Sequence, residues 1–592
     1  MKTIKIKKIL LVTLLAASIV SCKKQFDQLP ETQLDASQMY RDVYDANAAV
    51  IGLYGKFMSL SDRYIVLNEL RADLMKFTMN ADESLRQLST HTVSADNPYA
   101  NPRPFYELIN NCNDVLKNFV IMRQKNTLGV DEFNQRYSDI ACLRSFLYLQ
   151  LGIHYGRVPY ITQPLENLAD LNDINRFPKL ELPQLIDSLV EFTDAIPFKG
   201  DYPPAVGAAI GASLNVTLDG YPTSKFFINK RILLGDLHLW KGDYQKAATY
   251  YRQVMETATT GTVNDNYYTQ YKNGWGTANM YISYGRAGDV STLNYENGWG
   301  SWFFATDDRF NREIIWALPY DSRFKPANPL INLFSPVGGS YQVTASEEIM
   351  DNWNRQQQAA MTVSSSLTVG TAGIPFDARK LISVRNVSGQ PTIMKFITNY
   401  VHPGSLTTIN PFNKNGRWFL YRQAHLHLRF AEAANRAGYP KLAYALYNNG
   451  IPNVYQSPAN TPDKTIWQNT LDLPAPFNFD ARNGEIPYYR GEWYRNIGIR
   501  ARANLINYSL SATSVADSIS QNEIGLLNES ALETAFEGNR WSDLLRIAIR
   551  RNDPSVIADK VYDRMRKDGV GDPAAVRAKL MTRDWFLPFK LQ

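Results

Sequence analysis

Hydrophobic residues recur at helical spacing along much of the chain. In the stretch from Asp35 to Leu60, the apolar positions with this spacing are Val43, Ala46, Val50, Leu53, Tyr54 and Phe57. The same periodicity predicts further helices over residues 64–77, 105–122 and 132–155. Apolar residues three and four positions apart share one face of a helix, so each stretch indicates a helix packed on a hydrophobic core. We therefore predict a mainly α-helical fold.

The clearest local pattern is a pair of helices joined by a short turn within Ser224–Thr257. The first helix is expected to end near Trp240, and the second to begin at Tyr244, after a Gly-Asp step. Small alanines at Ala247 and Ala248 would let the two helices approach closely, which is typical of tetratricopeptide repeats.

Two further copies of this helix–turn–helix pattern occur at Leu428–Asn449 and, more loosely, at Ala531–Arg551. Their uneven spacing excludes a uniform tandem array. Residues 319–417 are instead rich in Gly, Pro, Ser and Asn, with brief β-branched runs such as Leu367–Val369. The sequence therefore predicts a tetratricopeptide-like scaffold of helix pairs, interrupted by long loop-rich insertions with a few short strands.

Aromatic residues are concentrated between positions 267 and 304, which hold eleven of them. The tetrapeptide NGWG occurs twice there, at Asn273–Gly276 and Asn297–Gly300. Asn and Gly favour turns, which would expose the tryptophan ring to solvent. Exposed flat rings can stack on the apolar faces of sugar rings. We predict that the ligand-contacting rings are Trp275, Tyr284, Trp299 and Trp302.

The amino terminus has the pattern of an export signal. Positive residues from Lys2 to Lys8 precede the apolar run Ile9–Val20, whose twelve residues are too few to span a bilayer. The run ends at Ile19–Cys22, which resembles a bacterial lipobox. We expect residues 1–21 to be removed and Cys22 to be lipidated, anchoring the chain in a membrane. No aspartate follows that cysteine, which favours the cell outer membrane with the protein at the surface.

Charge and cysteine content exclude several classes of function. Removal of the four lysines in the signal segment lowers the formal charge from +6 to +2, which gives no electrostatic support for a nucleic-acid partner. Three cysteines are too few for a Cys-rich zinc site. Cys112 and Cys142 are expected either to form a disulfide or to be small buried side chains. Scattered aspartates such as Asp289 and Asp307 lack EF-hand spacing, so we predict no metal and no other cofactor.

The sequence carries no recognisable catalytic motif. Neither HExxH nor GxSxG occurs, and Asp307, Asp308 and Glu313, the acids that follow the aromatic segment, form no known pattern. His425 and His427 are two residues apart, which directs them to different faces of a helix. We therefore predict a binding protein and not an enzyme.

Several motifs, taken together and in order, resemble the SusD/RagB-like (starch-utilisation-system D-like) outer-membrane lipoproteins of Bacteroidetes. Beside the lipobox these are ACLRSFLYLQLGIHYGRVPYIT at 141–162, KGDYQKAATYYRQVM at 241–255, NREIIWALPY at 311–320, YRQAHLHLRFAEAANRAG at 421–438, ALETAFEGNRWSDLLRIAIRR at 531–551 and DWFLPFK at 584–590. The resemblance implies one large domain over 22–592. Within it, the helical scaffold would cover about 35–257 and 418–592, and the ligand-facing loops about 258–417.

The resemblance also implies a role. Members of this family capture a nutrient, mostly a glycan, at the cell surface and deliver it to a SusC-like TonB-dependent transporter. Their ligand contacts often include an early loop, where the candidates in this chain are Asp73, Arg86, Asn97 and Tyr99. Two alternatives stay open: uptake of peptides, and a structural lid or assembly lipoprotein without a ligand of its own.

Overall fold

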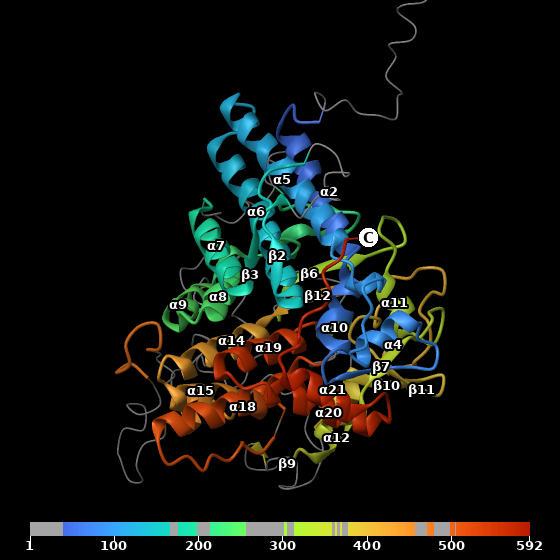
Figure 1. Cartoon of the computed structure of the whole chain (residues 1–592), viewed down its shortest axis with the longest axis vertical. Helices are drawn as coiled ribbons and strands as arrows, with labels where there is room; N and C mark the ends of the chain where they lie inside the picture. Colours follow the sequence, from blue (N-terminus) through green and yellow to red (C-terminus); the bar gives the residue numbers. More distant parts are fainter. Residues whose placement is uncertain are drawn as a thin grey trace, which may run out of the picture.

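The fold is a scaffold of paired helices with a smaller region of short strands beside it (Figure 1). The structure, a computed structural model, describes residues 39–165, 176–197, 214–255, 301–304, 313–357, 361–363, 367–369, 377–455, 470–478, 498–503 and 505–591. In Figure 1 the paired helices occupy the left and lower sides, whereas α4, α11 and strands β7, β10 and β11 gather at the right. The predicted mainly α, tetratricopeptide-like fold is confirmed.

Helix α2 begins the described part of the scaffold. It spans Val43–Met58, and the Asp42 side chain caps it by accepting from the backbone N–H groups of Tyr44 and Asp45. The cap satisfies amide groups that a helix start otherwise leaves unpaired. The apolar positions predicted from the sequence form most of its buried face. The next helices of the scaffold, packed in succession, are α5 (Arg103–Gln124), α6 (Val130–Tyr155) and α7 (Leu182–Ala195).

The predicted hairpin is confirmed as α8 (Lys230–Lys241) and α9 (Tyr244–Met255). Gly242 ends the first helix in the left-handed conformation, φ 87°, which glycine adopts without steric cost. Ala247 and Ala248 are fully buried where the two helices meet. The second pair is also confirmed, as α14 (Gln423–Arg436) and α15 (Pro440–Tyr447), which pack on each other and on α18.

Two sequence predictions need correction. The third pair has a longer first helix than expected, α18 (Val515–Glu533), followed by α19 (Arg540–Arg551). The stretch 64–77 is not one helix, since α3 (Ser61–Ile65) continues as a π-helical turn only to Leu70. Beyond that turn, β1 (Met75–Phe77) pairs with the distant β7 (Val343–Ala345). A long-range strand pairing of this kind overrides the local helical periodicity.

The strands form two-stranded antiparallel sheets. The longest pair joins β6 (Ile314–Tyr320) to β12 (Gly416–Arg422), and every residue of both strands is buried. The other pairs are β2 (Arg157–Pro159) with β3 (Lys179–Glu181), β4 (Thr217–Leu218) with β5 (Tyr221–Pro222), β8 (Met361–Val363) with β9 (Leu367–Val369), and β10 (Val384–Val387) with β11 (Gln390–Ile393). The short strands predicted for the loop-rich region are therefore present.

Shorter helices and the carboxyl end complete the structure. The short helices are α4 (Glu83–Ser89), η3 (Pro98–Ala100), η6 (Thr223–Lys225), α10 (Ser301–Phe304), α11 (Pro329–Phe334), α12 (Glu347–Arg355), α13 (Arg379–Ser383), α16 (Ile451–Val454) and α17 (Ile499–Arg502). Helices α20 (Ser555–Asp568) and α21 (Pro573–Met581) follow α19. The chain then returns to the start of the scaffold, where Leu587 N–H donates to the His154 carbonyl at 2.9 Å.

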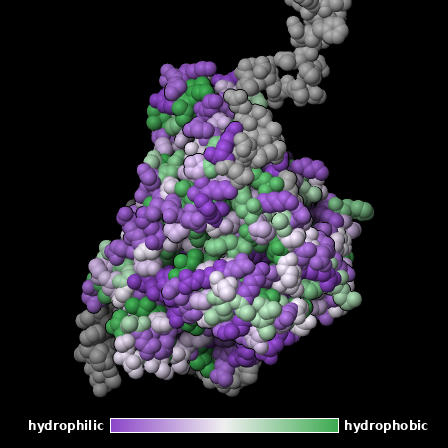
Figure 2. Space-filling view, viewed as in Figure 1, coloured by the Kyte–Doolittle hydropathy of each residue, from purple (hydrophilic) through white to green (hydrophobic). Residues whose placement is uncertain are grey.

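One hydrophobic core runs through most of these elements. Its buried residues extend from Ala46 to Leu587 and include both strands of the β6–β12 pair. The face seen in Figure 2 is predominantly hydrophilic, with hydrophobic side chains scattered among polar ones. In the part of the chain that the structure describes, we find no helix that combines the length and the apolar composition of a membrane span.

Candidate ligand-binding site

Four residues predicted to be functional lie outside the described residues. They are the lipidation site Cys22 and the three rings Trp275, Tyr284 and Trp299. The same is true of Asp289, Asp307 and Asp308. The aromatic segment is therefore described only from α10 onward, and its role in ligand binding stays a prediction.

Trp302, the fourth predicted ring, is packed inside the protein. Only 7% of it is exposed, and the guanidinium of Arg502 lies 5.1 Å from the centre of its ring. The next residue, Phe303, lies near the cations of Arg422 and Lys395. Cations over aromatic faces are attracted by the ring quadrupole. These contacts attach α10 to the core, so the structure gives Trp302 a packing role.

Two of the four early-loop candidates are also buried. Both oxygens of Asp73 accept hydrogen bonds from Arg540, at 2.6 and 2.7 Å. Asn97 caps the short helix η3 by accepting from Tyr99 N–H, and donates to the Ser84 carbonyl at 2.9 Å. Both side chains therefore hold the loop to the fold, with little polar capacity left for a ligand.

Arg86 and Tyr99, the other two candidates, are half-buried at the surface of the loop. Arg86 donates to the Ala81 and Met79 carbonyls, at 3.1 and 2.8 Å, and its guanidinium lies over the Phe77 ring. Tyr99 lies 5.8 Å from the guanidinium of Arg63. The structure thus brings the early-loop residues into one region, and only these two present accessible surface.

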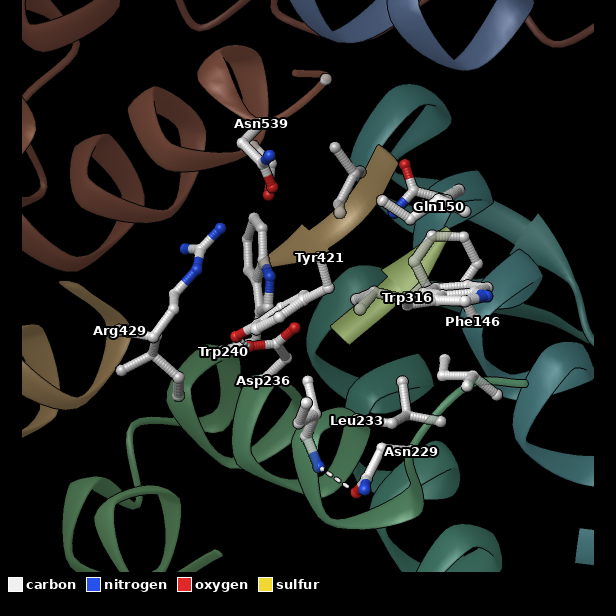
Figure 3. A pocket seen from close by; sticks show the side chains of 18 of the residues that line it. Phe146, Gln150, Asn229, Leu233, Asp236, Trp240, Trp316, Tyr421, Arg429 and Asn539 are labelled. Carbon is white, nitrogen blue, oxygen red and sulfur yellow. Dashed lines mark hydrogen bonds between the residues drawn. The ribbon is translucent and has the colours of Figure 1, made fainter. Parts of the chain in front are cut away.

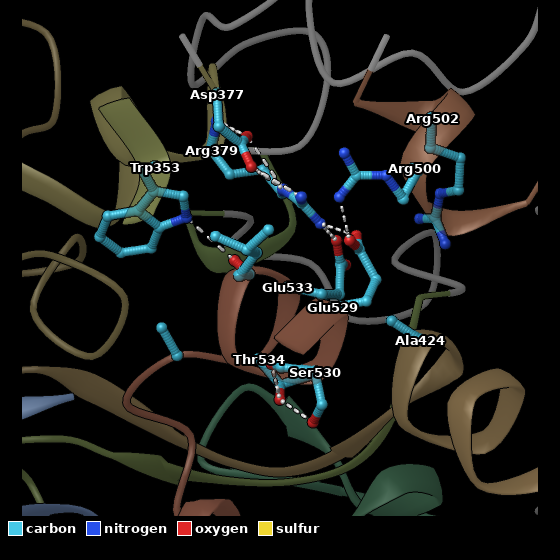
Figure 4. A network of polar contacts seen from close by, with 12 residues as sticks. Trp353, Asp377, Arg379, Ala424, Arg500, Arg502, Glu529, Ser530, Glu533 and Thr534 are labelled. Carbon is cyan, nitrogen blue, oxygen red and sulfur yellow. Dashed lines mark hydrogen bonds and ion pairs between the residues drawn. The ribbon is translucent and has the colours of Figure 1, made fainter. Parts of the chain in front are cut away.

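A network of buried charges lies next to α10, and Figure 4 shows part of it around Arg379, Glu529 and Glu533. Five carboxylates and five cations alternate in it, namely Glu313, Asp377, Glu529, Glu533 and Glu537 with Arg379, Lys395, Arg422, Arg500 and Arg502. Burial acts to raise the pKa of Glu537, but Arg422 and Lys395 outweigh it and lower that pKa to about 2. Taking charged groups out of water is costly, and here each buried charge lies next to an opposite charge that offsets this cost. The network joins α13, α17 and α18 to the β6–β12 pair.

His425, His427 and Glu313 are buried in the core. Burial lowers the pKa of both His425 and His427 to about 3, so each is neutral at physiological pH. Glu313 is fully buried, with its oxygens on Arg422 at 2.9 Å and Arg502 at 3.3 Å. Within the described ranges, no three His, Cys, Asp or Glu side chains are grouped as a metal ion requires.

A first cavity in the described structure is too small for an organic ligand. It lies between α8, α14, α19 and the β6–β12 pair, with Asp236, Trp240, Tyr421 and Arg429 around it (Figure 3). Its volume is about 40 Å³, whereas one water molecule occupies about 30 Å³ in the liquid. Burial also raises the pKa of Asp236. This cavity has room for water only.

The second cavity is an open groove of about 460 Å³. Its walls come from the second half of α2, the β4–β5 hairpin, the end of β6 and the segment Phe324–Pro326. The rings of Tyr221 and Phe324 meet edge to face in it, 6.0 Å apart. No local sequence motif marks this groove, because its walls come from distant parts of the chain.

A polar cluster fixes the geometry of this groove. Tyr221 O–H donates to Asp321 at 2.8 Å, and Arg323 donates to both oxygens of Asp321 at 2.9 Å. Burial, together with the hydrogen bond to Asp321, raises the pKa of Tyr221 to about 12. The hydrogen bonds from Arg323 lower the pKa of Asp321 to about 2. The Tyr221 ring is thus held in one orientation by a permanently charged partner.

Comparison with known proteins identifies the fold. No protein-family model and no curated protein sequence matches the chain. Two SusD superfamily structures match it at 15% sequence identity. The structure from Bacteroides vulgatus has a TM-score of 0.53, and the match covers 92% of this chain and 93% of the other. The structure from Bacteroides thetaiotaomicron has a TM-score of 0.54, and the match covers 90% of this chain and 98% of the other. Surface glycan-binding protein A from Bacteroides uniformis, also 15% identical, has 0.52 over 92% and 95%. The chain therefore has the SusD-like fold.

Proposed function

We propose that this protein is a cell-surface nutrient-binding lipoprotein that captures an oligosaccharide or polysaccharide and passes it to a TonB-dependent outer-membrane transporter. The observation that carries the proposal is the SusD-like fold, which extends over nine-tenths of the chain and is shared with a protein named as a surface glycan-binding protein. Capture without chemistry agrees with the neutral, buried histidines of α14.

Glycan contacts are assigned to the aromatic segment and to the accessible part of the early loop. Trp275, Tyr284 and Trp299 supply flat rings that stack on sugars, and Arg86 and Tyr99 supply polar groups at their edge. The signal-like amino terminus and Cys22 supply the membrane anchor in this proposal.

Isothermal titration of the soluble chain from Lys23 onward tests capture directly. A panel of plant, fungal and bacterial polysaccharides, with mixed peptides as a second panel, is titrated and the solution is then examined for cleavage products. Binding of one glycan class without cleavage supports the proposal. Binding of peptides alone would replace glycan by peptide as the ligand, and cleavage would show an enzyme.

Transporter association needs a separate experiment. The lipidated full-length chain is purified from outer membranes, and a TonB-dependent transporter is expected to co-purify with it. A chain that binds glycan but purifies alone would retain the capture function and contradict delivery to a transporter.

A further inference from the structure

The groove beside α2 has the size and surface of a small-molecule site. Its volume of about 460 Å³ falls within the range of ligand pockets. Most of its wall is apolar, from aliphatic side chains, prolines and the rings of Tyr221 and Phe324. Contact with this wall removes apolar ligand surface from water, which stabilises a complex by roughly 25 cal/mol per Å².

Two glycines keep the groove open. Gly52 and Gly55 lie one helical turn apart on α2, and a methyl group built on either would meet no atom within 4 Å. Elsewhere in the helices glycine is required by packing, since a methyl group on Gly152 would lie 2.8 Å from Leu182. Alanine in a helix interior is more favourable than glycine. On α2 the glycines therefore have one evident structural effect, which is to leave the groove unfilled.

The rim of the groove is cationic. Lys56 and Lys325 both line it and are exposed, and neither side chain has a hydrogen bond or ion pair within the described structure. The nearby Arg323 is already bound to Asp321 and to the Asp219 carbonyl. Asp219 carries the one carboxylate among the lining residues, so the rim has an excess of one positive charge.

The polar groups of the groove do not suit a hydroxyl-rich ligand. The Tyr221 hydroxyl is occupied by Asp321, which leaves the two ammonium groups as the main donors. A sugar would bury hydroxyl groups against apolar walls without partners, which is costly. A ligand with an alkyl or aryl body and one anionic head would satisfy both the walls and the rim.

We propose that this groove is a second ligand site, separate from glycan capture, that binds an amphiphilic monoanion. The apolar body lies against Gly52, Gly55 and the Tyr221–Phe324 pair, and the anionic head lies between Lys56 and Lys325. This inference goes beyond the proposed function and does not depend on it.

Titration of the soluble chain with octanoate, octyl sulfate and 1-octanol, all below their aggregation limits, tests the site. Octanoate and octyl sulfate are expected to bind saturably at one site, and 1-octanol at least tenfold more weakly because it has no charge for the lysines. Equal affinity for 1-octanol, or no saturable binding of either anion, would overturn the proposal.

Two sets of variants test the contributions of the apolar walls and of the cationic rim separately. Gly55→Leu is expected to abolish octanoate binding by filling the groove, and Lys56→Met with Lys325→Met to weaken it at least tenfold. Lys125→Met, at an exposed lysine at the carboxyl end of α5 that does not line the groove, is the matched control and should bind normally. Unchanged binding in the double lysine variant, with a normal thermal transition, contradicts the assigned rim. Glycan titration of the same variants is expected to be unchanged, which keeps this test independent of the proposed function.

Discussion

Asp73 and Arg540 form a buried two-point ion pair although 467 residues separate them in the chain. Both hydrogen bonds are short, at 2.6 and 2.7 Å, and each side chain is almost completely buried. Arg540 opens α19, while Asp73 follows the π-helical turn near the start of the scaffold. The pair therefore ties the first helices to the last repeat pair, and a residue predicted to bind ligand holds the two ends of the fold together.

Removal of one partner of this pair should destabilise the protein strongly. Asp73→Ala leaves the Arg540 charge buried and unpaired, so we expect a loss of about 3–5 kcal/mol in the free energy of unfolding. The control is Asp96→Ala, which breaks the exposed pair with Lys590 of the same 2.6 Å length and should cost less than about 1 kcal/mol. Urea unfolding measures both, and equal losses would contradict the structural role of Asp73.

The tryptophans of the aromatic segment should separate into two classes. Trp302→Ala removes a buried ring and is expected to cost about 3–5 kcal/mol of stability. Trp275→Ala with Trp299→Ala should weaken glycan binding by at least tenfold and leave the thermal transition unchanged. Phe412→Ala, at a ring that is 87% exposed on another loop, is the control for nonspecific loss of surface aromatics. Unchanged glycan binding in the double variant would contradict the predicted role of Trp275 and Trp299 in ligand binding.

Stability should fall as the pH rises from about 4.5 to about 8 because of Glu69. Burial raises the pKa of this carboxyl from 4.5 to about 8, although backbone N–H groups of Gly538 and Asn539 donate to it. The folded state then holds a proton that the unfolded chain releases, at up to about 1.4 kcal/mol per pH unit. Urea unfolding at pH 5 and pH 8 measures the slope. Glu69→Gln should remove this contribution and the exposed control Glu83→Gln should keep it; identical slopes in the wild type and Glu69→Gln would be inconsistent with a raised pKa.

Glycines in two helices should respond oppositely to alanine. Gly55→Ala on α2 meets open space, so the better helix propensity of alanine is expected to raise stability by about 0.5–1 kcal/mol. On α8, Gly235→Ala would place a methyl group against the Tyr251 ring and should lower stability by about 1–3 kcal/mol. Thermal unfolding of the two variants provides the measurement. A loss in both would show that the groove wall is more tightly packed than the structure indicates.

The two cysteines of the soluble chain should be reduced and unreactive in the native protein. No disulfide joins Cys112 and Cys142 in the structure, and both side chains are buried. Burial raises the pKa of the Cys112 thiol to about 12, which suppresses the reactive thiolate. A thiol reagent should therefore find no fast-reacting group in the native chain and two groups in guanidinium chloride. No reactive thiol after denaturation would demonstrate a disulfide.

Features set by local sequence were predicted well. The α8–α9 and α14–α15 pairs were found within a few residues of their observed ends, because apolar spacing and a glycine turn act over one or two helical turns. Prediction failed at 64–77, where the partner strand Val343–Ala345 lies far along the chain and leaves no trace in the local pattern.

By itself, the sequence determined the helical scaffold, its repeat-like pairs and the position of the aromatic segment, since each depends on neighbouring residues. Only the tertiary structure decided how Asp73 and Trp302 are used. Asp73 became a structural ion pair because folding brings Arg540 to it, and Trp302 became buried because Arg502 lies against its ring. The groove at Gly55 likewise exists only where four separate segments meet. Burial and charge pairing depend on contacts between distant residues, and such contacts exist only after the chain has folded.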